Sequence, residues 1–495
     1  MPARSSFVMG RNIGLSFPEN SGRLGLEPSI LNVLPPGDNV EYSPRNRRFN
    51  DQEVERYLCS VYIAGMDEFR AWAQQHDTRK IVVGGYHPTM FPEAFLNLAD
   101  KIVMGPCDDL AATLAQRGVL FERGHYNAQK VGNARFVAGR ILRTLPHEEG
   151  FVRVHGGVRP GRAPEQPSGA GEVLEDRVLP GIVTFQHTPR LDLYDLRNNQ
   201  QVIPGKLPDD LSTSINSSFG CPYHCDFCYT PVMFGPSIIA KPIAAFEREV
   251  GLVAARLDAA DPERQKGRFL FFRDENFPLL RDYRERLEIT QATGAKLYLF
   301  ASANRVTEEV ADAFAKNNVY MVCLGLEDPT KEYAKNRELA AAIGRLKRHG
   351  IATYLSFIVD PTKLVGRGAN GTTGAEKGKE FYDLLMARFE ELRPEMVCGN
   401  FLMPFPGTPV WDEYYWLVNE TDFKHYDSKT PFLVKNDLVA EKLRYFMFDV
   451  QWRYYTSEFY DKEVRTFATG DTLHRRFLEL REQFDDSLSI LHLRP

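Results

Sequence analysis

The sequence predicts an α/β protein with two parallel-sheet domains and a helical C-terminal region. Short, continuously apolar runs alternate with helical stretches in two separate parts of the chain, and a tight group of cysteines follows the first strand of the second part. Apolar strands joined by helices are typical of parallel sheets that are buried on both faces. We therefore expect a doubly wound, Rossmann-like sheet followed by a partial TIM-type (β/α)6 barrel.

The first predicted domain covers residues 1–115. Its expected strands are residues 58–65, 80–86 and 101–106, and its expected helix is 67–76. The pair Gly84 and Gly85 closes the second of these strands. Because ligands of such sheets bind beyond the carboxyl ends of the strands, this pair marks a candidate ligand-binding edge.

Residues 116–210 show little periodicity, and 155–171 are rich in Gly, Pro and Arg, so we expect an irregular connecting region there. Strand–helix alternation resumes over residues 211–410, the predicted barrel. Its expected strands are 212–218, 268–272, 296–301, 319–325, 351–359 and 396–403, and its expected helices are 244–257, 307–317, 338–349 and 380–392.

Residues 411–495 are rich in aromatic and charged side chains, and 437–460 reads as a long amphipathic helix. One interpretation is a helix that packs across the barrel, and the other is a lid over the substrate. The pattern favours packing, because an aromatic stripe at helical spacing is most often core.

The composition is that of an ordinary soluble globular protein, with 495 residues, 43% hydrophobic and 26% charged. A formal net charge of −5 carries no bulk basic pattern for nucleic acid. We see no apolar run near the roughly 18 residues of a membrane span and no signal peptide. We therefore expect a cytoplasmic protein without a membrane span or a nucleic-acid partner.

Three of the seven cysteines, Cys221, Cys225 and Cys228, lie within eight residues in the spacing C-x3-C-x2-C. Their thiolates can bind three irons of one [4Fe–4S] cluster, and because such clusters ordinarily take four cysteines, one iron would stay open. Zinc is an alternative that needs a fourth ligand such as His224. An electron-transfer cluster is another, and free structural cysteines are a third. The other cysteines, Cys59, Cys107, Cys323 and Cys398, are interpreted as small buried apolar residues, with Cys323 and Cys398 as the candidate fourth ligands.

Four further stretches follow the cysteines in order: Arg268–Phe277 with an acidic turn, Ser302–Arg305, Gly325–Asp328 and Met403–Pro409. Together with the cysteine loop they make residues 211–410 resemble the radical S-adenosylmethionine (SAM) superfamily. The resemblance implies that the open iron chelates SAM and that one electron cleaves it to a 5′-deoxyadenosyl radical. That radical would take hydrogen from a small-molecule substrate, with a flavodoxin or ferredoxin as electron donor.

The resemblance also implies which residues contact SAM. Phe227 would pack near the adenine, and Asp274 and Glu275 would contact the amino group. Ser302 and Arg305 would face SAM, and Glu327 would contact the ribose hydroxyls. Asp328 stands where the family usually has Ser, so only Glu327 of that turn is carried over. Each has a plain alternative as a solvated turn or a residue at a helix start.

The N-terminal domain resembles the cobalamin-binding domain that precedes the barrel in one large subfamily, on Ile81–Pro88 and Lys101–Gly105. Gly84 and Gly85 would then contact cobalamin. No Asp-x-His-x-x-Gly motif marks a lower cobalt ligand, and His87 is interpreted as a loop histidine bonded to the backbone. The alternative is a domain that only supports the barrel.

These observations leave three functions open. The favoured one is cobalamin-dependent C-methylation of a small molecule in natural-product (antibiotic) biosynthesis. The second is cobalamin-independent radical dehydration of a sugar or aminoglycoside diol. The third is an iron–sulfur binding or redox protein without radical catalysis, which would not cleave SAM. The sequence identifies neither the substrate nor a catalytic residue that completes the reaction.

Overall fold

The computed structural model describes residues 7–9, 40–42, 56–61, 66–90, 92–105, 107–115, 119–122, 141–144, 177–181, 209–234, 237–365, 372–419 and 428–464, with a few single residues between these ranges. The chain forms two compact units. Unit 1 contains residues 1–201, 213–263 and 403–427, and unit 2 contains residues 202–212, 264–402 and 428–495.

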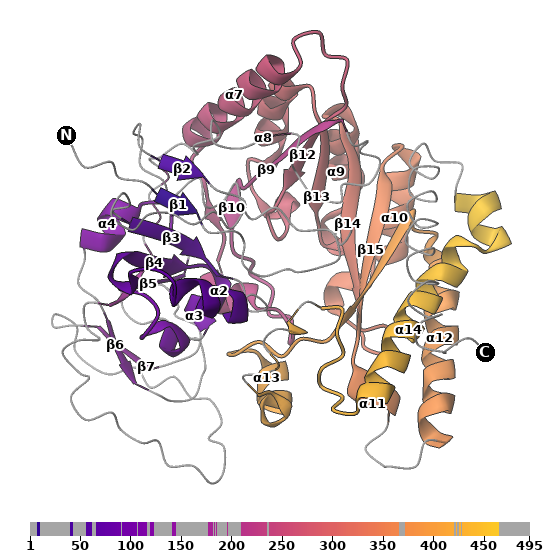
Figure 1. Cartoon of the computed structure of the whole chain (residues 1–495). Helices are drawn as coiled ribbons and strands as arrows, with labels where there is room; N and C mark the ends of the chain where they lie inside the picture. Colours follow the sequence, from indigo (N-terminus) through magenta and orange to yellow (C-terminus); the bar gives the residue numbers. More distant parts are fainter. Residues whose placement is uncertain are drawn as a thin grey trace. The chain divides into compact units, whose positions relative to one another are not determined.

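The first sheet, in unit 1, is parallel throughout and has the strand order β2-β1-β3-β4-β5-β8 (Figure 1). The order 2-1-3-4-5 is that of flavodoxin-like sheets, in which the winding reverses between β1 and β3. This confirms the doubly wound prediction. The strands are β1 (Phe7–Met9), β2 (Val40–Tyr42), β3 (Arg56–Ser60), β4 (Ile81–Gly84), β5 (Lys101–Met104) and β8 (Val178–Pro180).

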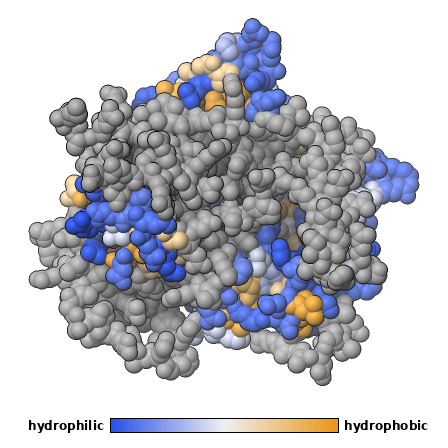
Figure 2. Space-filling model, in the orientation of Figure 1, coloured by the Kyte–Doolittle hydropathy of each residue, from blue (hydrophilic) through white to orange (hydrophobic). Residues whose placement is uncertain are grey.

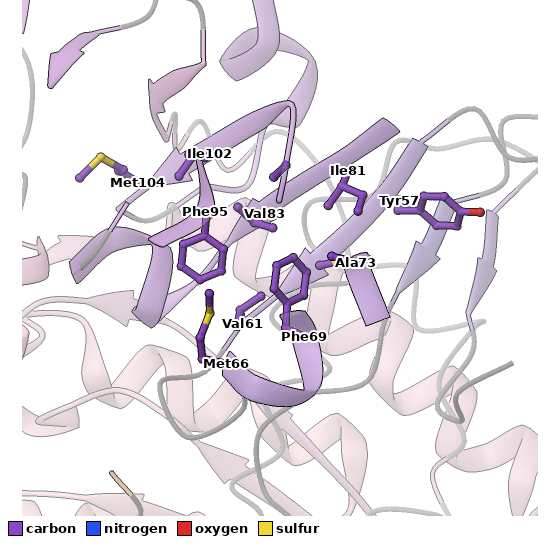
Figure 3. Packing of buried hydrophobic residues seen from close by; sticks show 12 residues of the cluster. Tyr57, Val61, Met66, Phe69, Ala73, Ile81, Val83, Phe95, Ile102 and Met104 are labelled. Carbon is purple, nitrogen blue, oxygen red and sulfur yellow. The ribbon is translucent and has the colours of Figure 1, made fainter. Parts of the chain in front are cut away.

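Alternate residues of the first sheet's strands build its core. Tyr57, Ile81 and Val83 belong to one buried cluster together with Phe69 of α2 and Phe95 (Figure 3). Cys59 is buried in the same cluster, as the sequence predicts. The helices of this part are α2 (Met66–Ala73), α3 (Tyr86–Met90) and α4 (Leu110–Ala115).

The sheet differs from the prediction at two places. The strand expected over 80–86 ends at Gly84, because Gly85 turns to a φ of 100° and Tyr86 already begins α3. Within the predicted connecting region, β8 pairs with β5 as an edge strand, and β6 (Val119–Glu122) and β7 (Ile141–Thr144) form an antiparallel pair. A three-residue strand that ends in Pro180 is too short to recognise by periodicity, and an edge is where proline is tolerated.

The second sheet has six strands in the order β16-β15-β14-β13-β12-β9, and the strands from β12 to β16 pair in parallel. It confirms the predicted six-stranded, barrel-type sheet. Its strands are β9 (Leu211–Ile215), β12 (Arg268–Phe272), β13 (Lys296–Phe300), β14 (Val319–Glu327), β15 (Ala352–Val359) and β16 (Met396–Phe401). The helices between them are α7 (Ile243–Ala260), α8 (Tyr283–Thr290), α9 (Glu308–Lys316), α10 (Leu339–Arg348), α11 (Pro361–Val365) and α12 (Thr372–Leu392).

The two faces of this sheet differ in burial. On β15, Leu355, Phe357 and Val359 are buried, and the Phe357 ring packs against Phe389 of α12. The alternate residues are only half-buried. We call this second side the inner face and define it on the two last strands by Tyr354, Ser356 and Ile358 of β15 and Met396, Cys398 and Asn400 of β16.

The predicted C-terminal helix, α14 (Asp437–Tyr455), ends earlier than expected and is followed by a π-helical turn at Tyr460–Val464. Three tyrosine hydroxyls anchor the helix and this turn to the segment around the start of β16. From the helix, Tyr454 donates to the Pro394 carbonyl (2.6 Å) and Tyr455 to the Val397 carbonyl (3.2 Å). From the turn, Tyr460 donates to the Glu395 carbonyl (3.0 Å). These contacts agree with the interpretation of a packed helix.

Hydrophilic side chains interleave with small hydrophobic areas on the described surface in Figure 2. Of the helices in the described part of the chain, none combines the length and the low polarity that crossing a lipid bilayer requires.

Candidate cluster and cofactor site

The three clustered cysteines lie on a loop of unit 1 between β10 (Ser218–Phe219) and α6 (Thr230–Phe234). β10 pairs antiparallel with β11 (Ile239–Ala240), which fixes the strand that leads into the loop. Cys221 is buried, and Cys225 and Cys228 are half-buried. The Cys228 amide donates to the Cys225 carbonyl (3.0 Å), so these two residues share one tight turn.

Gly220 allows the chain to enter the loop. Its φ is 89°, and a Cβ at this position would lie 2.2 Å from the carbonyl oxygen of Ser237. Only glycine adopts this conformation without cost and tolerates such a close backbone neighbour. Directly before it, the Phe219 ring stacks against Phe185 and Phe234, with centroids at 6.1 and 5.5 Å.

The donor chemistry of the loop fits an iron–sulfur cluster. Three thiols within eight residues are the ligand type that such clusters take. Burial raises the pKa of Cys228 to about 11, although hydrogen bonds from Thr230 lower it in part. A metal ion binds the thiolate and displaces the proton. The fit is one of ligand type and not of a preformed site. In the described part of the chain, no set of three or more His, Cys, Asp or Glu side chains is arranged to hold a metal ion.

A second predicted motif, Met403–Pro409, lies against the cysteine loop within unit 1. The Val410 amide donates to the carbonyl of Asp226 (3.2 Å), one of the two residues between the second and third cysteines. The rings of Tyr229 and Phe405 pack at 5.5 Å, which adds an aromatic contact beside this bond. Thr408 accepts from the Trp411 amide (3.2 Å) and so caps the helix α13 (Pro409–Tyr414).

In unit 2, the ends of β12 and β13 are tied together by a side chain that sequence reasoning did not single out. Asn276 donates from Nδ2 to the Ser302 hydroxyl (2.8 Å) and accepts from the Ser302 amide at Oδ1 (3.1 Å). Just before Asn276 in the chain, Asp274 is fully buried and Glu275 is half-buried. Arg305 is exposed in a 3-10 turn (Ala303–Arg305), so the structure places it in the turn before α9.

Glu327 ends β14 with its carboxylate folded back over Gly325. Its φ is 61°, and a Cβ on Gly325 would lie 2.0 Å from its Oε1. Lys335 forms a short ion pair with this carboxylate. The next residue, Asp328, accepts from Thr330 and pairs with Lys363 (3.2 Å). No sequence pattern predicts that Lys335 and Lys363 are the partners of these carboxylates.

At the C-terminal edge of the first sheet, Gly85 and Gly105 follow the neighbouring strands β4 and β5 with φ values of 100° and 76°. Thr89 connects them: its hydroxyl donates to the Gly85 carbonyl (2.6 Å) and accepts from the Gly105 amide (2.9 Å). His87 is fully buried, its ring edge-on to Phe95 at 5.1 Å and its amide bonded to the Val61 carbonyl (3.1 Å).

Residues 215–361 match the family model of the radical SAM superfamily, and this part of the chain is therefore a radical SAM domain. The chain is similar to bacteriochlorophyllide d C-12(1)-methyltransferase of Chlorobaculum tepidum, with 26% identity over 235 residues that cover 45% of this chain and 47% of that protein. It is also similar to hopanoid C-2 methylase of Rhodopseudomonas palustris, with 25% identity over 246 residues, 46% of this chain and 42% of that protein.

The chain thus spans about half the length of the curated relatives it matches. Among solved structures, the radical S-adenosylmethionine methyltransferase TsrM from Kitasatospora setae, with cobalamin and a [4Fe–4S] cluster bound, is 17% identical, with a TM-score of 0.45 over 83% of this chain and 74% of that one.

Proposed function

We propose that this protein is a radical SAM enzyme that methylates carbon in a small-molecule substrate. The observation that carries the proposal is the three-thiol loop in a radical SAM domain in which Asp274 follows β12, Ser302 follows β13 and Glu327 ends β14. Two relatives named as methylating enzymes support methyl transfer as the outcome. A flavodoxin or ferredoxin is the proposed electron donor.

In this proposal Cys221, Cys225 and Cys228 hold the [4Fe–4S] cluster. When bound, the cluster and SAM together supply radical chemistry that opens an unactivated C–H bond. The protein's own contribution is to bind and orient. Asn276 holds Ser302 in one rotamer, and Gly325 leaves the space in which the Glu327 carboxylate can accept from two ribose hydroxyls.

We assign the remaining SAM contacts by the same resemblance. Phe227, half-buried beside Cys228, is the adenine neighbour, and Asp274 and Glu275 are the partners of the amino group. Asp274 is the better placed of the two carboxylates to act on a cation, because its full burial strengthens its electrostatic interactions. Arg305 is the weakest member of the set, since its exposure leaves it solvated.

We further propose that the first sheet binds cobalamin as the methyl carrier. Its flavodoxin-like strand order places ligands at the C-terminal edge, where Gly84, Gly85 and Gly105 leave backbone without bulky side chains. A Cβ at Gly105 would meet nothing within 4 Å. Because His87 is buried edge-on to Phe95, we assign it to the core and expect no histidine ligand to cobalt from this position.

A polycationic sugar, the substrate class of the alternative dehydration reaction, would need carboxylates to bind its ammonium groups. The carboxylates at the end of β14 do not support this alternative. Glu327 pairs with Lys335, and Asp328 pairs with Lys363. Both carboxylates therefore already have a cationic partner from this chain.

Anaerobic reconstitution in the presence of hydroxocobalamin tests the proposal. After desalting, we expect about four irons and sulfides and one cobalt per chain, as the cluster stoichiometry requires. About four irons without cobalt would contradict the methyl carrier and leave the radical SAM assignment intact. Absence of iron after careful reconstitution would contradict the whole proposal.

The Glu327→Ala variant tests the ribose assignment. We expect SAM affinity to fall at least about tenfold, because hydrogen bonds to a charged group contribute roughly 1.5–3 kcal/mol each. Iron and sulfide content should not change. The exposed Glu332 lies on the same loop, so Glu332→Ala is the matched control. Equal SAM affinity in both variants, measured by equilibrium dialysis, would remove Glu327 from the site.

A further inference from the structure

Asn276 and Ser302 form a buried pair of polar side chains just beyond the ends of β12 and β13. The two strands pair in parallel, so the residues that follow them come together at one edge of the sheet. Asn276 is 6% exposed and Ser302 is 7% exposed. Asn276 Nδ2 donates to the Ser302 hydroxyl (2.8 Å), and Asn276 Oδ1 accepts from the Ser302 amide (3.1 Å). We call these two residues the donor pair.

The backbone of Ser302 determines which way the side-chain amide of Asn276 faces. A backbone amide can only donate, so the Asn276 atom that faces it must be the oxygen. The nitrogen then faces the Ser302 hydroxyl, and because an amide nitrogen does not accept, the hydroxyl is the acceptor of that bond. The proton of the Ser302 hydroxyl and the second N–H of Asn276 are therefore two donors that the bonds of the pair do not use.

Neither of these two donors has an acceptor in the part of the chain that the structure describes, where the side chains of the donor pair make only the two bonds given above. A buried donor without a partner costs free energy, and an acceptor that reaches it recovers that cost. The nitrogen and the oxygen that carry the two donors lie 2.8 Å apart. One carboxylate, which has two acceptor oxygens, can therefore accept from both.

Both residues also lack the bond that their positions in the chain ordinarily provide. Asn276 is the N-cap residue of the 3-10 turn Phe277–Leu279, and Ser302 is the N-cap residue of the 3-10 turn Ala303–Arg305. Asn and Ser at such positions usually accept from a backbone N–H of the turn that follows, which stabilises the turn. Neither side chain makes that bond here. The stability of the two turns therefore does not explain why an amide and a hydroxyl stand at these positions.

We propose that the donor pair binds the α-carboxylate of SAM, which makes Asn276 a further SAM-binding residue. This inference rests on the proposed function, in which Ser302 faces SAM and Asp274 is a partner of its amino group. The ammonium and the carboxylate of an amino acid are carried by the same carbon, so their partners must be neighbours. Asp274 precedes Asn276 by two residues. A carboxylate accepts hydrogen bonds and does not donate them, which matches the two donors.

A comparison of SAM with decarboxylated SAM tests this role separately from the rest of the binding site. Decarboxylated SAM keeps the adenosine, the sulfonium and the ammonium and lacks the carboxylate. The measurement is the dissociation constant of each compound for the full-length, reconstituted protein, by equilibrium dialysis. We expect the wild type to bind SAM at least about tenfold more tightly than decarboxylated SAM. Equal affinities would overturn the proposal.

The Asn276→Asp variant removes the donors of Asn276 and keeps the shape of its side chain. One carboxylate oxygen can still accept from the Ser302 amide, and the other can accept from the Ser302 hydroxyl, so that O–H is then used inside the protein. We expect SAM affinity to fall at least about tenfold and the affinity for decarboxylated SAM not to fall. A general defect of folding would instead lower both affinities by the same factor.

A second variant and a matched control complete the test. Ser302→Ala removes one donor, and the preference for SAM over decarboxylated SAM should again fall at least about tenfold. Asn304→Asp makes the same exchange as Asn276→Asp at an exposed position of the turn Ala303–Arg305 and should keep the wild-type preference. An unchanged preference in both donor-pair variants would overturn the proposal, and so would an equal loss of preference in Asn304→Asp.

SAM cleavage by the reduced wild-type protein separates this inference from the proposed function. Cleavage by the wild type, together with an unchanged preference in both donor-pair variants, would contradict the inference and leave the proposed function standing. A preference for SAM that Asn276→Asp abolishes, in a protein that does not cleave SAM, would contradict the proposed function and support the donor pair.

Discussion

Replacing any one of Cys221, Cys225 and Cys228 with alanine should remove the iron–sulfur cluster and, with it, SAM cleavage. In the proposed site each cysteine supplies one of three protein ligands, and no nearby residue of the loop offers a fourth thiol. Loss of outer-shell partners alone costs metal sites about 10- to 100-fold, so we expect the loss of a ligand to exceed about a hundredfold. Iron and sulfide content and the cluster's visible absorbance measure the first effect, and 5′-deoxyadenosine release measures the second.

Cys107→Ala is the control for these three variants. Cys107 is also half-buried, and its sulfur lies 3.3 Å from the Thr113 hydroxyl, in the first sheet's domain. It should keep full iron and sulfide content. Full retention of iron in any loop variant would remove that cysteine from the ligand set.

Gly220→Ala should have the second largest effect, a destabilisation of about 2–5 kcal/mol and loss of cluster retention. The backbone conformation alone costs about 1–2 kcal/mol for alanine. The new methyl group would also meet the Ser237 carbonyl at 2.2 Å, and overpacking of this kind adds about 1–3 kcal/mol. Thermal denaturation and iron content after reconstitution are the two measurements.

Gly350→Ala separates the cost of the backbone conformation from the cost of the close contact. Gly350 has a similar φ of 72°, and a Cβ there meets nothing within 4 Å. It should show the conformational cost alone, about 1–2 kcal/mol, with normal iron content. Equal destabilisation of both variants would mean that the loop yields at Ser237 and that the close contact is not a constraint.

The fold was predictable where apolar runs were long and their ends were marked. The strand expected at Arg268–Phe272 is found with the same bounds, and Thr307, where a helix was expected to start, is the N-cap of α9. The prediction failed where a strand was short or where a glycine changed direction. β8 has three residues, and α3 begins at Tyr86 because Gly85 takes a positive φ.

The candidate site was likewise predictable only in part. The cysteine spacing and the acidic strand ends are local patterns, so they can be read from the chain. The partners of Glu327 and Asp328 are lysines 8 and 35 residues away, and Lys429 meets Cys398 from 31 residues away. Single lysines carry no periodicity, and only tertiary structure brings them to a carboxylate or a thiol.

The bond between the Val410 amide and the Asp226 carbonyl has a consequence for how the protein is made. At roughly 5–20 residues per second of synthesis, residue 410 is added roughly 10–40 s after residue 226. Throughout that interval the nascent chain presents three thiols without the segment that later packs on their loop. Oxygen and stray metal ions therefore have their best access during translation, so low-oxygen expression should protect these cysteines before any purification step begins.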